Sequence, residues 1–174
     1  MPFNFALLSS IKFILPSQIN INLSVPLVWK VILLGDGSFT RHCNILTYTN
    51  STIRHISTVV YTKTGQSLKS YINRKVWIGT NRKEKLILAS SWWNSKEYQS
   101  IFKSPSKAIG VSLIHSEVDF YRDLHGVFLG YSQELENLFL VKGPFWGRYY
   151  TLFHKGKPIS IIYEIFSPLL ETVK

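Results

Sequence analysis

A single carboxylate interrupts an apolar run near the end of the chain. Glu164 lies within Ile159–Phe166, among isoleucine, tyrosine and phenylalanine residues. On a strand, alternation places Glu164 on the same face as Ser160, Ile162 and Phe166. An ionised carboxylate is costly to bury on such a face unless a charged or polar group meets it. Glu164 is therefore a candidate for a buried ion pair, for a solvated edge position, or for one end of a binding site.

Two arginines have the chemistry to meet an acid. Arg74 opens the apolar segment Arg74–Thr80, and a guanidinium can grip a carboxylate through two parallel hydrogen bonds. The alternative for Arg74 is an exposed charge at the end of a strand. Arg148 follows the letters FWG, and it would either pair with an acid or lay its aliphatic part along the aromatic side chains.

A glycine-rich turn offers a different kind of anion site. Gly35–Arg41 reads GDGSFTR, and the backbone N–H groups of such a turn could face an anion. The segment lacks the Gly-Lys-Ser/Thr ending of a P-loop. An ordinary turn stabilised by the aspartate side chain is the competing interpretation.

The sequence lacks the motifs of several other common kinds of site. Cys43 is the single cysteine, so no internal disulfide can form and a zinc finger is excluded. We expect Cys43 to be a small core residue in a reducing compartment. There is no GxSxG motif and no paired-carboxylate signature. The histidines lack metal-ligand spacing, so we predict no metal site: His42, His55, His115, His125 and His154.

Hairpin patterns place these candidates on strands. Gly143–Pro168 contains two aromatic-rich runs on either side of HKGKP, which predicts a β-hairpin with a glycine in its loop. Arg74–Thr80 and Lys85–Trp92 are predicted to form a second hairpin. Phe39–Tyr48 and Ser51–Tyr61 alternate well enough to predict two further strands.

The remaining segments complete a mixed architecture. Val28–Leu34 is a buried apolar strand or the end of a helix, and Pro105–Ser116 has a helical pattern. Val118–Leu129 fits either a helix or a strand. Ser132 opens a short helix, SQELENLFL, with Glu134 in its first turn. About six strands with helices grouped at the start and middle predict one α+β domain, residues 1–174, built on an antiparallel sheet.

Composition indicates a globular protein with an anionic ligand. The 174 residues are 45% hydrophobic and 17% charged, which excludes a disordered chain. The formal net charge of +10 would suit a small anion, a nucleic acid or a membrane surface. The basic residues are scattered rather than gathered in a dense block, so we expect a solvated exterior and a small-anion site, and no nucleic acid. An organellar nucleic-acid-binding protein is the alternative.

The N-terminal segment FALLSSIKFILP is too short to span a bilayer and is interrupted by Lys12 and Pro16. It lacks the small-residue cleavage site of a secretory signal, and we expect it to pack on the domain. Alanine is scarce, while isoleucine, asparagine, lysine and serine are plentiful. This bias indicates an AT-rich coding genome such as that of an organelle.

Four segments together resemble the chorismate lyase (chorismate–pyruvate lyase) family, especially its cyanobacterial and plastid-encoded branch. The segments are LLGDGSFTRH at Leu33–His42, RKVWIG at Arg74–Gly79, AIGVSL at Ala108–Leu113, and FWGRYYTLFHKGKPISIIYEIFSP at Phe145–Pro168. The resemblance implies a highly twisted antiparallel sheet with helices covering a buried ligand pocket. The same fold serves as the effector-sensing domain of some bacterial transcription regulators.

The resemblance also implies an activity, its residues and a location. Family members convert chorismate to 4-hydroxybenzoate, a quinone head-group precursor, and pyruvate, with no cofactor or metal. By motif position, Arg74 is expected to hold the ring carboxylate with help from backbone amides near Phe39 and Ile109. Glu164 is expected at the ring hydroxyl, as a base or only as an anchor. The implied protein is a monomer in the plastid (chloroplast) stroma, encoded in the organelle.

Three departures from the bacterial branch of the family affect substrate closure more than the anchor pair. His42 stands where a second arginine is common there, and Phe39 replaces a methionine. The region His115–Lys142 is longer, so the lid is expected to differ. A non-catalytic binding or sensor domain for a small aromatic acid is the alternative function, although no helix-turn-helix domain precedes the fold.

Overall fold

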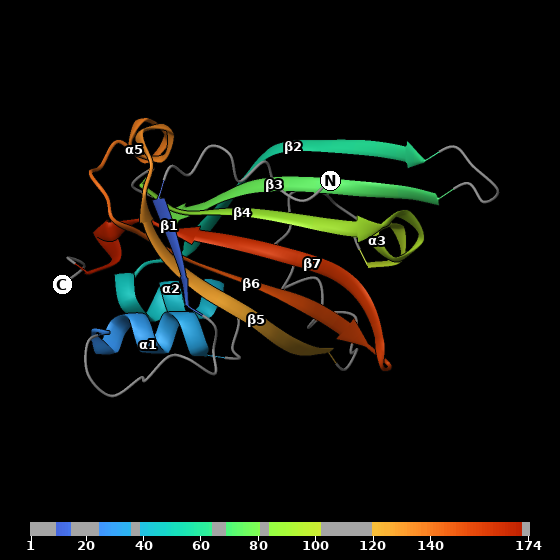
Figure 1. The fold of residues 1–174 in the computed structure, drawn as a ribbon, viewed down its shortest axis with the longest axis horizontal. Helices are drawn as coiled ribbons and strands as arrows, with labels where there is room; N and C mark the ends of the chain where they lie inside the picture. Colours follow the sequence, from blue (N-terminus) through green and yellow to red (C-terminus); the bar gives the residue numbers. More distant parts are fainter. Residues whose placement is uncertain are drawn as a thin grey trace.

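One seven-stranded antiparallel sheet organises the part of the chain that the structure describes (Figure 1). This computed structural model describes residues 10–14, 25–35, 39–63, 69–80, 84–101 and 120–171. The strand order is β1-β5-β6-β7-β4-β3-β2. The strands are β1 (Ser10–Ile14), β2 (Ser51–Lys63), β3 (Lys69–Thr80), β4 (Lys85–Asn94), β5 (Phe120–Tyr131), β6 (Phe145–His154) and β7 (Lys157–Phe166). The helices are α1 (Leu27–Leu34), α2 (Phe39–Thr47), α3 (Ser95–Ile101), α5 (Gln133–Phe139) and the 3-10 turn η3 (Pro168–Glu171).

The predicted α+β class with an antiparallel sheet is confirmed. The sheet has one strand more than expected, because β1 and β5 were not among the predicted strands and one predicted strand is a helix. Strand β1 pairs with β5, with Ser10 opposite Tyr131. Val118–Leu129, which the sequence left open, contains most of strand β5. Pro105–Ser116 lies outside the described residues.

Both predicted hairpins are confirmed. The β6–β7 hairpin turns at Lys155 and Gly156, whose φ angles of 47° and 72° are both positive. Such a pair matches the right-handed twist of the two strands that it joins. In the other hairpin, β3 begins at Lys69 rather than at Arg74. Arg74 is therefore in the middle of a strand, and the alternative of an exposed strand-end charge is wrong.

The strand predicted over Phe39–Tyr48 is wrong, since these residues form helix α2 and its end. Phe39 and Cys43 are both buried, and their spacing of four places them on one side of a helix. In an extended strand, Phe39 and Cys43 would also share one face, with polar residues such as His42 on the other, and this pattern led to the strand prediction. Cys43 is a buried core residue, as expected. Val28–Leu34 belongs to helix α1, so its helical interpretation is the correct one.

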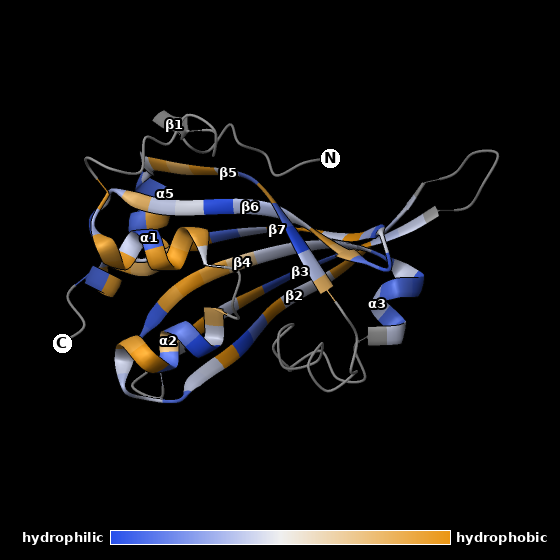
Figure 2. Cartoon of the chain, turned by 90° about the horizontal axis from the view of Figure 1, so that it is seen from below, coloured by the Kyte–Doolittle hydropathy of each residue, from blue (hydrophilic) through white to orange (hydrophobic). Residues whose placement is uncertain are grey.

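Helices α1 and α2 cover one face of the sheet at one end of the molecule, and their apolar residues pack against the strands (Figure 2). Trp29 of α1 lies 6.0 Å from Trp146 between ring centroids, and Phe39 of α2 lies 5.2 Å from Phe166. A second apolar cluster lies farther along the sheet, where Tyr98 of α3 packs on Trp93. Helix α5 packs on the other face, with Phe139 against Trp77 of β3.

The predicted helix start at Ser132 is also confirmed. The Ser132 hydroxyl accepts a hydrogen bond from the backbone N–H of Leu135 at 3.3 Å, and Glu134 lies in the first turn of α5. This is the usual arrangement of a serine N-cap. The helix ends at Leu140, whose left-handed conformation (φ 60°) returns the chain to the sheet.

Candidate functional site

Arg74 and Glu164 lie on the same face of the sheet. Directly opposed residues of antiparallel strands point to the same side, and so do alternate residues along one strand. Arg74 of β3 lies opposite Ser91 of β4, and Ser91 lies opposite Ile162 of β7. Ile162 is two residues from Glu164. The arginine and the carboxylate therefore project to the side that α1 and α2 cover, as a shared binding site requires.

Arg74 and Glu164 lie two strand spacings apart across the sheet and two residues apart along the strand direction. Strand β4 lies between β3 and β7. With strands about 4.8 Å apart and about 3.4 Å per residue, their Cα atoms are roughly 12 Å apart. Arg74 is 1% exposed and Glu164 is 6% exposed, so both are enclosed by the protein.

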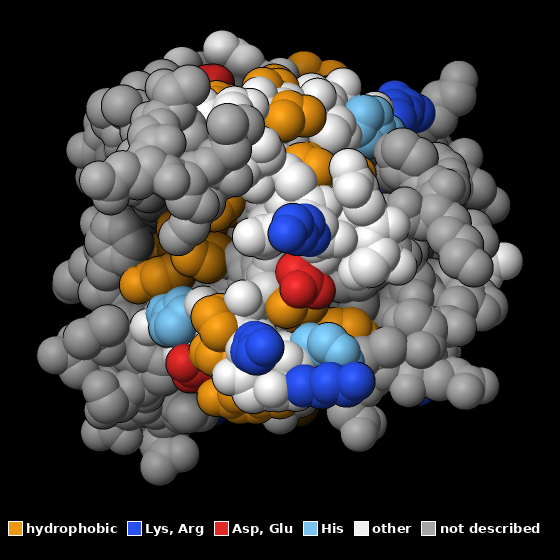
Figure 3. Space-filling model, turned by 90° about the vertical axis from the view of Figure 1, so that its right-hand side faces the viewer, with side chains coloured by type: hydrophobic (Ala, Val, Ile, Leu, Met, Phe, Trp, Pro, Cys, Tyr) orange, Lys and Arg blue, Asp and Glu red, His pale blue; other side chains and the backbone are white. Residues whose placement is uncertain are grey.

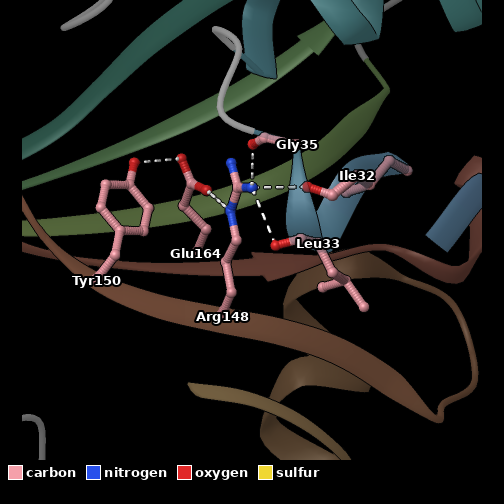
Figure 4. Close-up of polar contacts among 6 residues, drawn as sticks. All are labelled: Ile32, Leu33, Gly35, Arg148, Tyr150 and Glu164. Atoms are coloured by element: carbon pink, nitrogen blue, oxygen red, sulfur yellow. Dashed lines mark hydrogen bonds and ion pairs between the residues drawn. The ribbon is translucent and has the colours of Figure 1, made fainter. Parts of the chain in front are cut away.

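Glu164 forms a buried ion pair with Arg148 on the neighbouring strand β6 (Figure 4). Arg148 Nε donates to Glu164 Oε2 at 2.6 Å. The acid pairing that the sequence offered for Arg148 is therefore confirmed, as is the buried ion pair that it offered for Glu164. Removing either partner would leave an uncompensated buried charge on the other.

The same arginine also binds the end of helix α1. Its Nη1 donates to the carbonyl oxygens of Ile32, Leu33 and Gly35 at 2.7, 3.3 and 3.2 Å. In Figure 4 the guanidinium lies between the Glu164 carboxylate and these three carbonyls. Arg148 thus joins strand β7 to the C-terminal end of α1, immediately before the glycine-rich turn.

Tyr150 holds the second oxygen of Glu164. Its hydroxyl donates to Glu164 Oε1 at 3.2 Å, from a position two residues after Arg148 on β6. Complete burial and then the nearby Glu164 carboxylate raise the pKa of Tyr150, so the phenol keeps its proton and acts as a donor. Arg122 of β5 lies over the Tyr150 ring, with 4.9 Å between its guanidinium carbon and the ring centroid.

Arg74 has hydroxyl groups nearby. Burial lowers the pKa of Arg74, and an interaction with the Tyr98 hydroxyl opposes this shift. The hydroxyl of Ser91 donates to the backbone carbonyl of Arg74 at 3.3 Å. Tyr98 comes from helix α3, which follows β4 directly, so the β3–β4 hairpin and its following helix together build the surroundings of Arg74.

His42 of α2 lies at the Glu164 end of the site, near Arg148 and Arg122. Burial lowers the pKa of His42, and so do the charges of Arg148 and Arg122, while Glu164 acts in the other direction. A Cβ added to Gly35 would lie 2.9 Å from His42 Cε1, so the ring packs closely on Gly35. His42 Nδ1 is buried and has no hydrogen-bond partner within the described structure.

The two predicted backbone contacts, near Phe39 and Ile109, stay predictions. Phe39 is the first residue of α2, where backbone N–H groups lack a partner within the helix, and its side chain is 3% exposed. Ile109 lies outside the described residues. Tyr150 and Arg122 were not among the predicted site residues. Tyr150 could have been found from its spacing of two from Arg148, whereas Arg122 lies on a strand that the sequence left undecided.

The positive charge does not gather into one patch on the face shown in Figure 3. There the lysine and arginine side chains of the described residues are separated by apolar, histidine and acidic ones. Among the described residues, no three histidine, cysteine or acidic side chains lie close enough together to hold a metal ion. Within the same ranges, no helix has the length and apolar character needed to cross a bilayer.

Sequence comparisons agree on one family. A family model described as "Chorismate pyruvate-lyase Rv2949c-like" matches residues 33–174. The chain is 66% identical over 171 residues to a Pyropia yezoensis protein named "Uncharacterized protein ycf21", with 98% of each chain covered. A Cyanophora paradoxa protein of the same name is 35% identical over 153 residues, which cover 82% of this chain and 78% of that one.

Structural comparisons show the same fold in regulator domains. The effector domain of PhnF from Mycobacterium smegmatis has a TM-score of 0.61 at 8% identity, over 78% of this chain and 91% of that domain. A GntR-family transcriptional regulator from Enterococcus faecalis has a TM-score of 0.50 at 8% identity, over 67% of this chain and 94% of that one. At such low identity these likenesses concern the fold alone.

Proposed function

Because this chain belongs to the Rv2949c-like chorismate pyruvate-lyase family, we propose that it eliminates pyruvate from chorismate and releases 4-hydroxybenzoate. The observation that carries this proposal is the placement of Arg74 and Glu164. They are two buried groups of opposite charge on one face of the sheet, with one strand between them. A ring with a carboxylate at one end and a hydroxyl at the other matches that arrangement.

Each end of the substrate has a matching group. Arg74 binds the ring carboxylate through charge-assisted hydrogen bonds. Backbone N–H groups near Phe39 and Ile109 add donors to the same carboxylate. Glu164 accepts a hydrogen bond from the ring hydroxyl.

The reaction needs orientation more than a strong acid or base. The ether bond breaks at the ring carbon next to the hydroxyl-bearing carbon, and the hydrogen on the hydroxyl-bearing carbon is lost. The ring becomes aromatic, and the enolpyruvyl group gains a hydrogen and leaves as pyruvate. Because aromaticity supplies a large driving force, the protein mainly fixes the reactive conformer and stabilises the shifting charge. Direct transfer of the ring hydrogen to the enolpyruvyl methylene balances the reaction without any external reagent.

The contacts of Glu164 favour the role of hydroxyl anchor over that of base. Its carboxylate is in an ion pair with Arg148 and accepts a second hydrogen bond from Tyr150. An ionised carboxylate has about four acceptor positions on its two oxygens, so room remains for a substrate hydroxyl. Taking up a proton would weaken the ion pair, which opposes the use of Glu164 as a base.

An activity assay tests this proposal. Purified protein is incubated with chorismate, and both products are quantified, 4-hydroxybenzoate by chromatography and pyruvate by a coupled reductase. We expect equal amounts of the two products, formed faster than in chorismate alone. The Arg74→Ala variant, purified in the same way, controls for a contaminating lyase of the expression host.

The assay also separates the lyase from a sensor of the same fold. If the protein binds 4-hydroxybenzoate tightly and forms no product at saturating chorismate, the lyase proposal fails and the non-catalytic binding domain replaces it. The regulator effector domains of this fold give that alternative its basis. We further propose a plastid location in the stroma and a role in supplying a quinone head group, in line with the algal ycf21 relatives.

A further inference from the structure

Arg148 contacts both the Glu164 carboxylate and the C-terminal end of helix α1. We propose that Arg148 is a positioning residue for hydroxyl recognition, which holds Glu164 in the one orientation that accepts a hydrogen bond from the ligand. This proposal rests on the assignment of Glu164 to the ring hydroxyl. Arg148 itself contacts no ligand group in this proposal.

Hydrogen bonds to the end of helix α1 fix the orientation of the Arg148 guanidinium. Three carbonyl oxygens, those of Ile32, Leu33 and Gly35, accept from Nη1 at 2.7 to 3.3 Å. Because the guanidinium is planar and rigid, fixing Nη1 also fixes the direction in which Nε donates. Nε then holds Glu164 Oε2 at 2.6 Å. The carboxylate orientation therefore depends on the end of α1 as well as on the sheet.

The chemistry of the helix end explains why an arginine is needed there. The last carbonyls of a helix have no intrahelical partners and carry partial negative charge. Ile32 and Leu33 belong to the last turn of α1. A lysine ammonium is a single point donor on a flexible stem, and it cannot reproduce a rigid fork that binds these carbonyls and Glu164 together. A lysine would keep the charge and lose the fixed direction.

Tyr150 completes the orientation of the carboxylate. Its hydroxyl donates to Oε1 at 3.2 Å, so each carboxylate oxygen has one internal donor. One acceptor position then remains on each oxygen. With Arg148 and Tyr150 in place, these remaining positions have defined directions, and one of them can meet a ligand hydroxyl.

The test compares two ligands that differ only by the hydroxyl. Calorimetry measures the dissociation constants of 4-hydroxybenzoate and benzoate for the wild type and for Arg148→Lys, Glu164→Gln and Arg54→Lys. A hydrogen bond to a charged group corresponds to a preference for 4-hydroxybenzoate of roughly 10- to 150-fold. We expect this preference in the wild type and in Arg54→Lys, which makes the same substitution at an exposed position on β2. We expect it to fall below about 3-fold in Arg148→Lys, with benzoate affinity nearly unchanged.

The other outcomes would contradict the role proposed for Arg148 or for Glu164. If Arg148→Lys keeps the wild-type preference for 4-hydroxybenzoate, Arg148 does not position the hydroxyl acceptor. The same conclusion follows if the variant binds both ligands more weakly by the same factor. If Glu164→Gln keeps the preference, or if the wild type shows none, the assigned role of Glu164 fails and this inference fails with it. Should Arg148→Lys be too unstable for calorimetry, its preference is read from the rise in melting temperature that each ligand causes in the cold-purified variant.

Discussion

Arg74 and Arg148 are two buried arginines on one sheet face, and they have different surroundings. Arg148 is 2% exposed, pairs with Glu164 and binds three carbonyls of α1 and its end. Arg74 is 1% exposed and lies beside the hydroxyl of Tyr98. The first arginine is matched by a carboxylate and a helix end of the protein itself. The second has burial and charge suited to a ligand carboxylate.

Burial of an arginine therefore does not by itself identify a binding site. Burying a guanidinium is costly, and the protein offsets that cost with a carboxylate at Arg148. At Arg74 the proposed function adds the carboxylate of the ligand. We expect changes at Arg148 to reduce mainly stability, because they leave the Glu164 carboxylate without its ion-pair partner. We expect changes at Arg74 to reduce mainly turnover, because they remove the proposed contact with the substrate carboxylate.

The largest effect is expected on stability, from Arg148→Met. This change leaves Glu164 as a buried charge without its partner, which costs about 3–5 kcal/mol in the free energy of unfolding. Urea unfolding at pH 7 measures the loss, and the double variant Arg148→Met/Glu164→Gln should recover part of it. Arg74→Met is the matched comparison, made at the other buried arginine of this face. An equal loss in the two single variants would remove the distinction between the arginines.

The second effect concerns catalysis. Arg74→Ala removes two charge-assisted hydrogen bonds to the ring carboxylate, and we expect kcat/KM for chorismate to fall about 100- to 1,000-fold, or roughly 3–4 kcal/mol. Steady-state kinetics measure the loss, and circular dichroism checks that the variant is folded. Arg54→Ala, an exposed arginine opposite Trp77 on the other face, is the matched control and should keep wild-type activity. Activity of Arg74→Ala within 3-fold of wild type would refute the assignment.

The sequence predicted the hairpin that carries Arg148 and Glu164 but could not predict that they pair. The turn at Lys155 and Gly156 would place Arg148 opposite Tyr163 in a regular ladder. A register shift after the Leu152–Ser160 pair moves the partner by one residue, so that Arg148 lies opposite Glu164. One residue of register decides which face a side chain reaches. Nothing in the local sequence indicated that shift.

Helix α2 could not be predicted for a different reason. Its buried residues, Phe39 and Cys43, fit a helix by their spacing of four, but the polar residues between them also fit strand alternation. Packing of Phe39 on Phe166 of β7 favours the helix, and that contact joins residues far apart in the sequence. The positions of Arg74 and Glu164 in two predicted strands were foreseeable, whereas their shared face required the observed strand order.

The smallest expected effect is on the pKa of His42, which Arg148 should influence more than Arg74 does. Burial lowers the pKa of His42, and the Arg148 charge lowers it further. The imidazole is therefore protonated more readily in the unfolded chain, and stability is lost as the pH falls from about 6.5 towards the lower folded-state pKa. Arg148→Met should raise the pKa of His42 and make this loss shallower, while Arg74→Met should change it less. An NMR titration of the His42 Cε1 proton between pH 5 and 8 measures both shifts, and equal shifts would show that Arg148 has no special electrostatic connection to His42.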